Sequence, residues 1–154
     1  DRHSCITGKW TENEGVAIFC AVGAVRGTGE GVNQLYTLTP DRKLNLLTNS
    51  NLEDVYGRGR TAVSLNFDSD GLDDIYILNN SGPREDGKEN DSAVYKNLQN
   101  GKFSKVATLA SDDVGETCVL AVDLNKDDYD DLIVCNRTNG QKIFLNNKSD
   151  DFKE

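Results

Sequence analysis

The sequence predicts an all-β fold of about three units, each with four antiparallel strands, and three observations support this prediction. An Asp-rich segment at residues 66–78 recurs at residues 123–135, an offset of 57 residues. Each copy lies between two short β-type runs, which makes it a loop between strands. Apart from a possible single turn at residues 51–55, no segment has a sustained helical period. The units are expected at about residues 1–50, 51–108 and 109–154 of a single domain.

The second and third units follow the same order of elements. One strand precedes the Asp-rich loop and another follows it; a third strand carries an aromatic residue and then Asn, and a fourth begins after a turn. In the second unit the strands are expected at residues 61–65, 75–78, 93–97 and 102–106, and in the third at residues 117–122, 132–135 and 142–146, with a fourth beginning in residues 149–154. The segment Gln-Asn-Gly at residues 99–101 predicts a tight hairpin.

The first unit is a more divergent copy. Its second, third and fourth strands are expected at residues 16–21, 34–38 and 44–47, the last after a Pro-Asp turn. Residues 11–15 stand in place of the Asp-rich loop and are polar, but they lack alternating Asp residues. The single histidine, His3, lies near the start of the chain, where a disordered end is expected.

Charge and hydropathy exclude two classes of function. The formal charge of −9 and the pI near 4.6 argue against a nucleic acid partner, because a phosphate backbone requires clustered Lys and Arg. The longest apolar runs span five to seven residues, far below the roughly 20 of a membrane-spanning helix. The chain starts without Met and with the charged segment Asp-Arg-His, which is typical of a mature or trimmed chain. Half of the 18 aspartates lie within residues 68–74 and 123–131, so cations are the better candidates for a ligand.

Oxygen donors recur at alternate positions in both Asp-rich loops, as they do in loops that hold Ca²⁺ through six to eight oxygens. The expected ligands are Asn66, Asp68, Asp70, the Leu72 carbonyl and Asp74 in the first loop, and Asp123, Asn125, Asp127, the Tyr129 carbonyl and Asp131 in the second. Gly71 allows the left-handed turn that such a loop needs, and Asp128 adopts the same conformation at low cost. The pattern therefore predicts two calcium-binding loops.

We call each row of alternating oxygen donors a ladder. Two other interpretations of these ladders are open. An EF-hand has an acidic bidentate ligand at its twelfth position, but that position is Ile77 in the first loop and Val134 in the second, both within apolar strands. The second alternative is that the acids only form solvated hairpin turns, for which Asp and Asn have a strong preference. The repetition of the spacing favours calcium over simple turns.

The segments NFDSDGLDDIYILNN and VDLNKDDYDDLIVCN resemble the FG-GAP/VCBS repeat of integrin α-chains and related β-propellers. More narrowly, GRGRTAVSLNF, NNSGP and VYKNLQNGKF resemble the propeller of the cartilage acidic protein family of secreted proteins. The resemblance is specific over residues 57–147 and weak over residues 10–50. It implies part of a β-propeller, with a calcium loop between the outer pair of consecutive strands in a blade. The chain departs from the family pattern at Asn66, at Asp128 and in a charged insertion at residues 84–92.

The length of the chain bears on how the propeller closes. Even four blades, the lower limit, would exceed it at about 50–57 residues per blade. The open ends are therefore expected to pack on protein partners, either further blades of the same protein or other subunits, because an unclosed array exposes edges that invite pairing. Ile75, Ile77, Ile133 and Phe144 are expected on the incompletely covered outer faces.

The cysteines and sequons bear on the compartment. Four cysteines allow three complete pairings, and hairpin spacing favours Cys5 with Cys20 and Cys118 with Cys135. The alternative is free buried thiols, which are common in protein cores. Disulfides would indicate an oxidising compartment, extracellular or lumenal. Glycosylation sequons at Asn79, Asn90, Asn136 and Asn147 lean toward the same compartment.

No paired nucleophile and base and no Gly-rich phosphate loop can be identified, so the sequence predicts no catalytic residue and no enzyme activity. We expect a calcium-binding propeller module for protein or matrix interaction. One alternative is a structural accessory subunit of a large assembly, membrane-associated or not; another is the appended propeller of an enzyme whose catalytic part lies outside this sequence. The accessory subunit would be favoured if the insertion at residues 84–92 were ordered against another chain.

Overall fold

The structure of the chain is a computed structural model that describes residues 2–11, 15–23, 29–80, 82, 84–109, 116–137, 140–148 and 151–154. Within these ranges every regular element is a strand and none is helical, so residues 51–55 form a loop rather than a helical turn. The strands are β1 (Arg2–Gly8), β2 (Ala17–Val22), β3 (Gln34–Leu38), β4 (Leu44–Leu47), β5 (Gly59–Leu65), β6 (Asp74–Asn79), β7 (Ser92–Asn97), β8 (Phe103–Leu109), β9 (Glu116–Val122), β10 (Asp131–Asn136), β11 (Gln141–Asn146) and β12 (Phe152–Lys153). The all-β prediction is confirmed.

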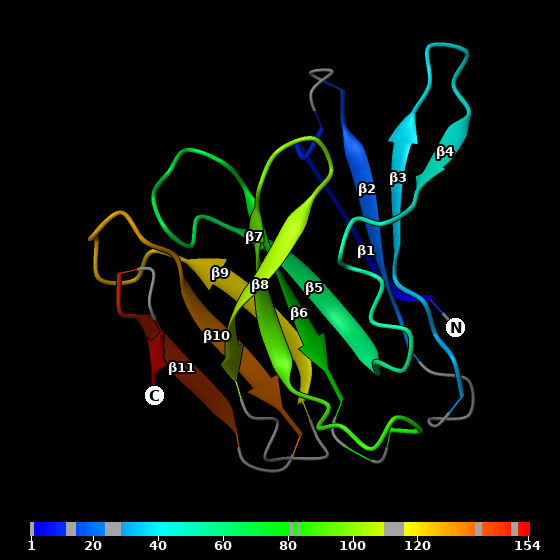
Figure 1. Cartoon of the computed structure of the whole chain (residues 1–154). Coiled ribbons are helices and arrows are strands. Elements are labelled where there is room, and N and C mark those ends of the chain that lie inside the picture. The colour runs from blue at the N-terminus through cyan, green and yellow to red at the C-terminus, as the bar shows by residue number, and fades with distance from the viewer. Residues whose placement is uncertain are drawn as a thin grey trace.

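The strands form three four-stranded sheets, and in each sheet consecutive strands pair antiparallel. We call them the first blade (β1–β4), the middle blade (β5–β8) and the third blade (β9–β12). Figure 1 shows the three blades side by side, with the middle blade between the other two. The predicted hairpin at residues 99–101 joins β7 to β8, with all three residues in the left-handed region. The arrangement is consistent with blades of a propeller.

The first strand of each blade lies innermost. β1 packs against β5, and β5 packs against β9, whereas β4, β8 and β12 lie at the opposite edges of their sheets. The two Asp-rich loops join β5 to β6 and β9 to β10, so they belong to the inner pair of strands. The expected location between the outer pair is therefore wrong, because the strand before each loop is the one that contacts the neighbouring blades.

Two apolar cores hold the blades together, and β6 contributes to both because its side chains alternate between the two faces of the sheet. Ile75 and Ile77 belong to the core between the first and middle blades. Tyr76 and Leu78 belong to the core between the middle and third blades, and Phe144 packs against that core. Ile75, Ile77 and Phe144 were expected on open faces, and this prediction is wrong because a neighbouring blade covers each of them.

The end blades each keep one open face with a cross-strand row of apolar residues. On the third blade Leu120, Ile133 and Ile143 are register partners on β9, β10 and β11, so they share one face. Leu120 is 55% exposed and Ile143 is 49% exposed. On the first blade a similar row across β2, β3 and β4 ends at Leu46, which is 46% exposed. Open faces are therefore present, as predicted, but mostly with other residues.

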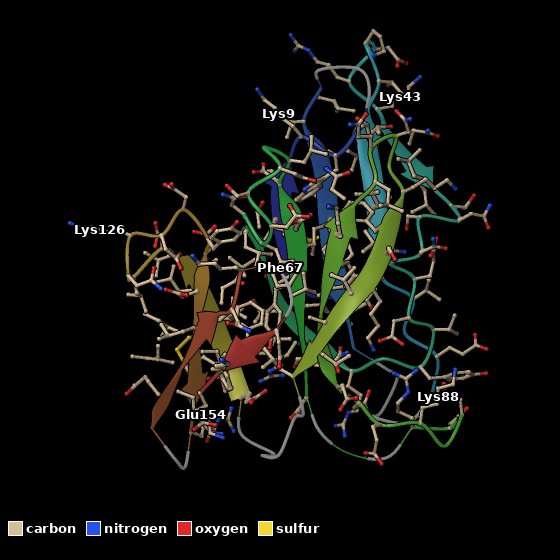
Figure 2. The ribbon with its side chains drawn as sticks, turned by 60° about the vertical axis from the view of Figure 1, so that its left-hand side comes forward. Lys9, Lys43, Phe67, Lys88, Lys126 and Glu154 are labelled. Atoms are coloured by element: carbon tan, nitrogen blue, oxygen red, sulfur yellow. A yellow bond between two sulfur atoms is a disulfide. The ribbon has the colours of Figure 1, made fainter. Side chains whose placement is uncertain are left out.

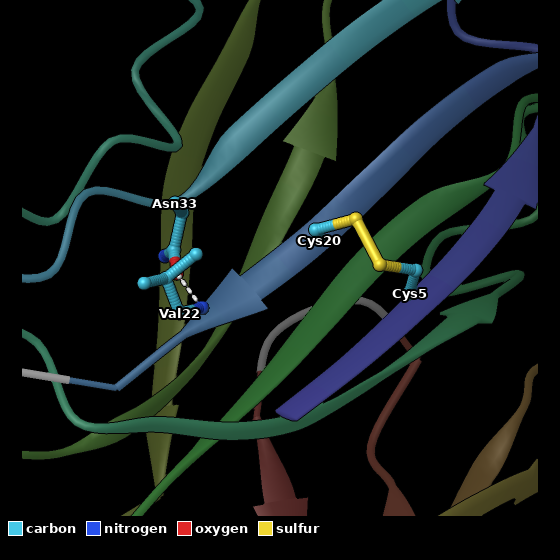
Figure 3. The surroundings of a disulfide bond; sticks show 4 residues. All are labelled: Cys5, Cys20, Val22 and Asn33. Atoms are coloured by element: carbon cyan, nitrogen blue, oxygen red, sulfur yellow. Dashed lines mark hydrogen bonds between the residues drawn. A yellow bond between two sulfur atoms is a disulfide. The ribbon is translucent and has the colours of Figure 1, made fainter. Parts of the chain in front are cut away.

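Both disulfides favoured by the spacing are present, each between the first two strands of an end blade. Cys5 and Cys20 are register partners on β1 and β2 (Figure 3), and Cys118 and Cys135 are register partners on β9 and β10. All four cysteines are bonded, so the alternative of free thiols is wrong.

The start of the chain is ordered. Arg2–Gly8 is the innermost strand of the first blade and pairs with β2, so the disordered end expected at His3 is wrong. Asn33 lies just before β3 and joins it to the end of β2, because its side-chain oxygen accepts the N–H of Val22 over 2.8 Å (Figure 3). The amide nitrogen of Asn33 donates to the Leu52 carbonyl over 3.0 Å.

The charged insertion at residues 84–92 is ordered against its own chain. The Arg84 guanidinium, whose side chain is 8% exposed, donates to a carboxylate oxygen of Asp54 and to one of Asp86, each over 2.9 Å. The hydrogen bond from Arg84 lowers the pKa of Asp86 to about 2. Since Asp54 precedes β5, these bonds connect the β6–β7 segment to the chain that enters the middle blade.

Three of the four sequon asparagines are buried. Asn79, Asn90 and Asn136 are at most 8% exposed, and the amide nitrogens of Asn79 and Asn90 donate to backbone carbonyls over 2.9 Å. Asn147 is exposed. The sequons therefore give less support for secretion than their number suggests.

Candidate metal centre

The predicted ligands lie in two loops at equivalent places in the fold. We call residues 66–74 the middle-blade loop and residues 123–131 the third-blade loop, and each connects the first two strands of its blade. Of the polar segment 11–15, which stands at the same place in the first blade, residues 12–14 lie outside the described residues.

The two loops follow the same backbone path, with left-handed residues at matching positions. The φ angle is +58° at Ser69 and +63° at Lys126, and it is +84° at Gly71 and +70° at Asp128. The left-handed conformation predicted for Gly71 and Asp128 is confirmed, whereas that of Ser69 and Lys126 was not predicted. A shared backbone means that differences between the loops come from their side chains.

A buried aspartate closes each loop. Asp74 and Asp131 are 0% exposed, and each accepts one N–H from the start of its own loop and one from the last residue of its blade's third strand. The donors are Phe67 at 3.2 Å and Asn97 at 2.7 Å for Asp74, and Leu124 at 3.0 Å and Asn146 at 2.8 Å for Asp131. These bonds fix the loop to the sheet.

The middle-blade loop holds a cation from its own chain. The ammonium of Lys96, on β7, forms an ion pair with Asp68 and another with Asp70, the latter at 3.2 Å. Burial raises the pKa of Asp74 to about 6, and the nearby carboxylates of Asp68 and Asp70 raise it as well. At Asp70 burial also raises the pKa, but the N–H of Leu72 and the ammonium of Lys96 outweigh burial, so this pKa lies below its usual value.

The third-blade loop is held by uncharged donors. One carboxylate oxygen of Asp123 accepts the N–H groups of Lys126 at 2.7 Å and Asp127 at 3.1 Å, and the other accepts that of Asp128 at 3.1 Å. These N–H donors outweigh desolvation and hold the pKa of Asp123 below its usual value. Lys126 itself extends away from the molecule at the loop tip, whereas Phe67 lies in the interior (Figure 2).

Asp127 completes the ladder of the third-blade loop. It accepts the N–H of Tyr129 at 3.2 Å and the side-chain amide of Asn125 at 3.2 Å. The equivalent bond in the middle-blade loop runs from the Leu72 N–H to Asp70 at 2.9 Å. Tyr129 and Leu72 are thus tied to their ladders through their N–H groups, and their carbonyls are the ligands that the sequence predicts.

The family model for the FG-GAP-like repeat matches residues 66–134, from the start of the middle-blade loop to β10. Residues 66–134 are therefore similar to an FG-GAP-like repeat. A repeat of this type is a non-catalytic module that suits protein interaction. No curated protein matches the chain. Within the described residues, no helix is long and apolar enough to span a membrane.

The two loops of the FG-GAP-like repeat dock on each other across the blade boundary. The N–H of Asn66 donates to the Asp130 carboxylate at 2.7 Å, and the N–H of Asp130 donates to the Asn66 carbonyl at 2.9 Å. The side-chain amide of Asn66 donates to the Asp128 carbonyl at 3.0 Å, and its oxygen accepts the Ser69 N–H at 3.1 Å. Asn66, which the sequence predicts as the leading ligand, bridges two blades.

Sequence reasoning missed three residues that shape the loops. Lys96 supplies the ion pairs described above. The side-chain amide of Asn97 donates to the Asp73 carbonyl at 3.1 Å, and that of Asn146 donates to the carbonyls of Asp130 and Phe67. The signal for the two asparagines was present in the sequence, because Asn stands two residues after an aromatic residue in both third strands.

The donor chemistry of the two loops differs in how well it suits a metal. In the described ranges no three His, Cys, Asp or Glu side chains converge as a metal cluster. The third-blade loop nevertheless carries carboxylate, amide and carbonyl oxygens along one left-handed turn, with uncharged donors around them, which fits a hard cation. In the middle-blade loop Lys96 already neutralises two of the carboxylates.

Proposed function

We propose that the chain is a calcium-stabilised, non-catalytic FG-GAP module that takes part in protein contacts in an extracellular or lumenal compartment. The observation that carries the proposal is the third-blade loop, where oxygen donors alternate along a turn fixed by the buried Asp131. Asp123, Asn125, Asp127, the Tyr129 carbonyl and Asp131 would hold Ca²⁺. The ion would supply positive charge to carboxylates that otherwise repel each other.

The disulfides support the proposed compartment. Cys5–Cys20 and Cys118–Cys135 each join two paired strands, and such bonds persist in oxidising environments. Extracellular calcium modules bind at roughly 10⁻⁴ to 10⁻³ M, so the proposed calcium binding is compatible with this compartment.

The open faces of the end blades support the proposed protein contacts. Both faces of the middle blade are covered by apolar faces of its neighbours, and Leu120 and Ile143 on the third blade and Leu46 on the first blade extend the same kind of surface. We assign a further four-stranded apolar sheet to each open face, supplied by the same protein or by another subunit. This occupant continues the packing that already joins the blades.

The alternative of an accessory subunit gains no support from the charged insertion. Arg84 connects that segment to Asp54 and Asp86 of the same chain, so its order needs no second chain. An appended enzyme propeller is likewise not favoured by a particular observation.

Thermal unfolding in calcium and in EGTA tests the proposal. With a Kd near 10⁻⁴ M, about 10 mM Ca²⁺ stabilises the folded chain by about 2.7 kcal/mol, which corresponds to a rise in Tm of roughly 5–10 °C. The double variant Asp70→Ala/Asp127→Ala should lose this rise. The control Glu85→Ala/Glu89→Ala removes the same charge from exposed positions and should keep it. An unchanged calcium response in the first double variant would show that the ladders are only turns.

A further inference from the structure

Lys96 occupies a particular place in the middle blade. It lies on β7 one residue after Tyr95, which pairs with Ile75 of β6. From there its side chain reaches the β5–β6 loop and pairs with Asp68 and Asp70. Its side chain is 33% exposed, so the ammonium is partly withdrawn from water.

The equivalent position in the third blade is Leu145. It lies on β11 one residue after Phe144, which pairs with Leu132 of β10 in the way that Tyr95 pairs with Ile75. Leu145 is 42% exposed and carries no charge. Among the described contacts, the nearby Lys126 and Lys153 form no ion pair with the third-blade loop.

The two loops therefore have equal numbers of ladder carboxylates and unequal neutralisation. Asp68, Asp70 and Asp74 stand in one loop, and Asp123, Asp127 and Asp131 stand in the other. Within the part of the chain that the structure describes, the first set alone has an ammonium among its carboxylate oxygens. A divalent cation would need those same oxygens, and it would be repelled by the ammonium. Because Lys96 is covalently part of the chain, it competes at a high effective concentration.

We infer that Lys96 is a built-in counter-cation that takes the place of a metal ion in the middle-blade loop, so that the chain binds one divalent cation, in the third-blade loop, rather than two. This inference rests on the calcium binding proposed above. It assigns the calcium response of the module to the third blade alone. The residue after the third-strand aromatic, Lys96 or Leu145, then determines whether a loop binds a metal ion or is neutralised by a lysine.

The number of bound Ca²⁺ ions, measured by equilibrium dialysis and by calorimetric titration, tests the inference. The wild-type chain should bind one ion, Lys96→Leu should bind two, and Leu145→Lys should weaken binding at least tenfold. Asp127→Ala should abolish the wild-type site, and Asp70→Ala should leave it intact. Lys105→Leu removes a lysine from the neighbouring strand β8 and serves as the control, with one ion expected.

The outcomes separate this inference from the proposed function. Two ions on the wild-type chain, or one ion on Lys96→Leu, would overturn the role of Lys96 and leave calcium binding in place. No binding by the wild-type chain or by Lys96→Leu would overturn both. Circular dichroism checks the fold of each variant. Lys96→Gln, which keeps a polar side chain of similar reach, gives the same test if Lys96→Leu does not fold.

Discussion

The middle-blade loop and the third-blade loop share a backbone frame and differ in the charges around it. Both place left-handed residues at matching positions, and both are closed by a buried aspartate, Asp74 or Asp131, that accepts an N–H from the end of the third strand. One ladder has an ammonium from Lys96 and the other has Leu145 at that place. The backbone of each loop is therefore fixed by hydrogen bonds within its blade. The cation that neutralises the loop depends separately on one side chain, at the position of Lys96 or Leu145.

The blades that carry these loops also differ in how they are closed. The third blade has a disulfide between Cys118 and Cys135, and the register partners at the same place in the middle blade are Thr61 and Leu78. Leu78 is fully buried because the third blade covers it, whereas Cys118 lies on an open face. In the third blade a covalent bond thus joins the two strands at the place where no neighbouring blade packs on them.

Substitution of the two buried aspartates should reduce the free energy of unfolding most, and by similar amounts. Asp74→Ala leaves two buried N–H groups without an acceptor, and Asp131→Ala leaves one buried and one partly buried N–H group, so each variant costs about 3–4 kcal/mol of unfolding free energy. Urea unfolding in EGTA measures both variants under equal conditions. If either variant lost less than about 1 kcal/mol, the shared frame would not rest on these carboxylates.

The disulfide of the third blade should have the next largest effect. Cys118→Ser/Cys135→Ser should reduce the free energy of unfolding by about 3 kcal/mol, because the cross-link restricts the unfolded chain. Unfolding of this variant is compared with that of the wild-type chain, both without reductant. Equal stability of the two proteins would contradict the idea that the bond compensates for the open face.

Substitution of the two third-strand asparagines, Asn97 and Asn146, should reduce the free energy of unfolding by different amounts. The Asn97 side chain makes partly buried bonds within its own blade, donating to the Asp73 carbonyl and accepting the Gln99 N–H, whereas the Asn146 amide donates to Asp130 and also makes a buried bond across the blade boundary to Phe67. We expect Asn97→Ala to cost about 1 kcal/mol and Asn146→Ala about 2 kcal/mol. Urea midpoints give the comparison, and a larger loss for Asn97→Ala would contradict the role of Asn146 between the blades.

The smallest effect should be the pH dependence of stability that arises from Asp74 in the middle-blade loop. Burial raises the pKa of Asp74 to about 6 in the folded chain, above the value of the unfolded chain. The folded state therefore binds more protons than the unfolded state between these values, and stability should rise by about 1 kcal/mol as the pH falls from 7 to 5. Urea unfolding in EGTA at both pH values measures it. Asp74→Asn should remove this rise, and a rise that persists in that variant would assign it to another group.

The fold was predictable from the sequence because repetition at a fixed offset and alternating apolar residues are local signals. The Gln99–Gly101 hairpin, the cysteine pairs and the turns at Gly71 and Asp128 were found in this way. The burial of Ile75 and Ile77 was missed because it depends on which face of a strand meets a neighbouring blade. The strand at His3 was missed because Arg2–Gly8 is largely polar, and its order comes from pairing with β2 and packing against β5.

The site was only partly predictable for a similar reason. The oxygen ladders are contiguous, so their spacing is visible in the sequence. Lys96 follows the loop by more than 20 residues and reaches it only because β7 pairs with β6. The contact between Asn66 and Asp130 likewise spans two blades. Contacts that depend on strand pairing or blade packing cannot be seen in a spacing pattern.

Anomalous diffraction from crystals of the chain grown with Ca²⁺ tests the central comparison most directly, because it locates the ion and Lys96 in the same experiment. We expect one calcium peak, at Asp123 and Asp127 in the third-blade loop, with the Lys96 ammonium still paired with Asp68 in the middle-blade loop. A calcium peak within the middle-blade loop, with Lys96 turned away into solvent, would contradict it.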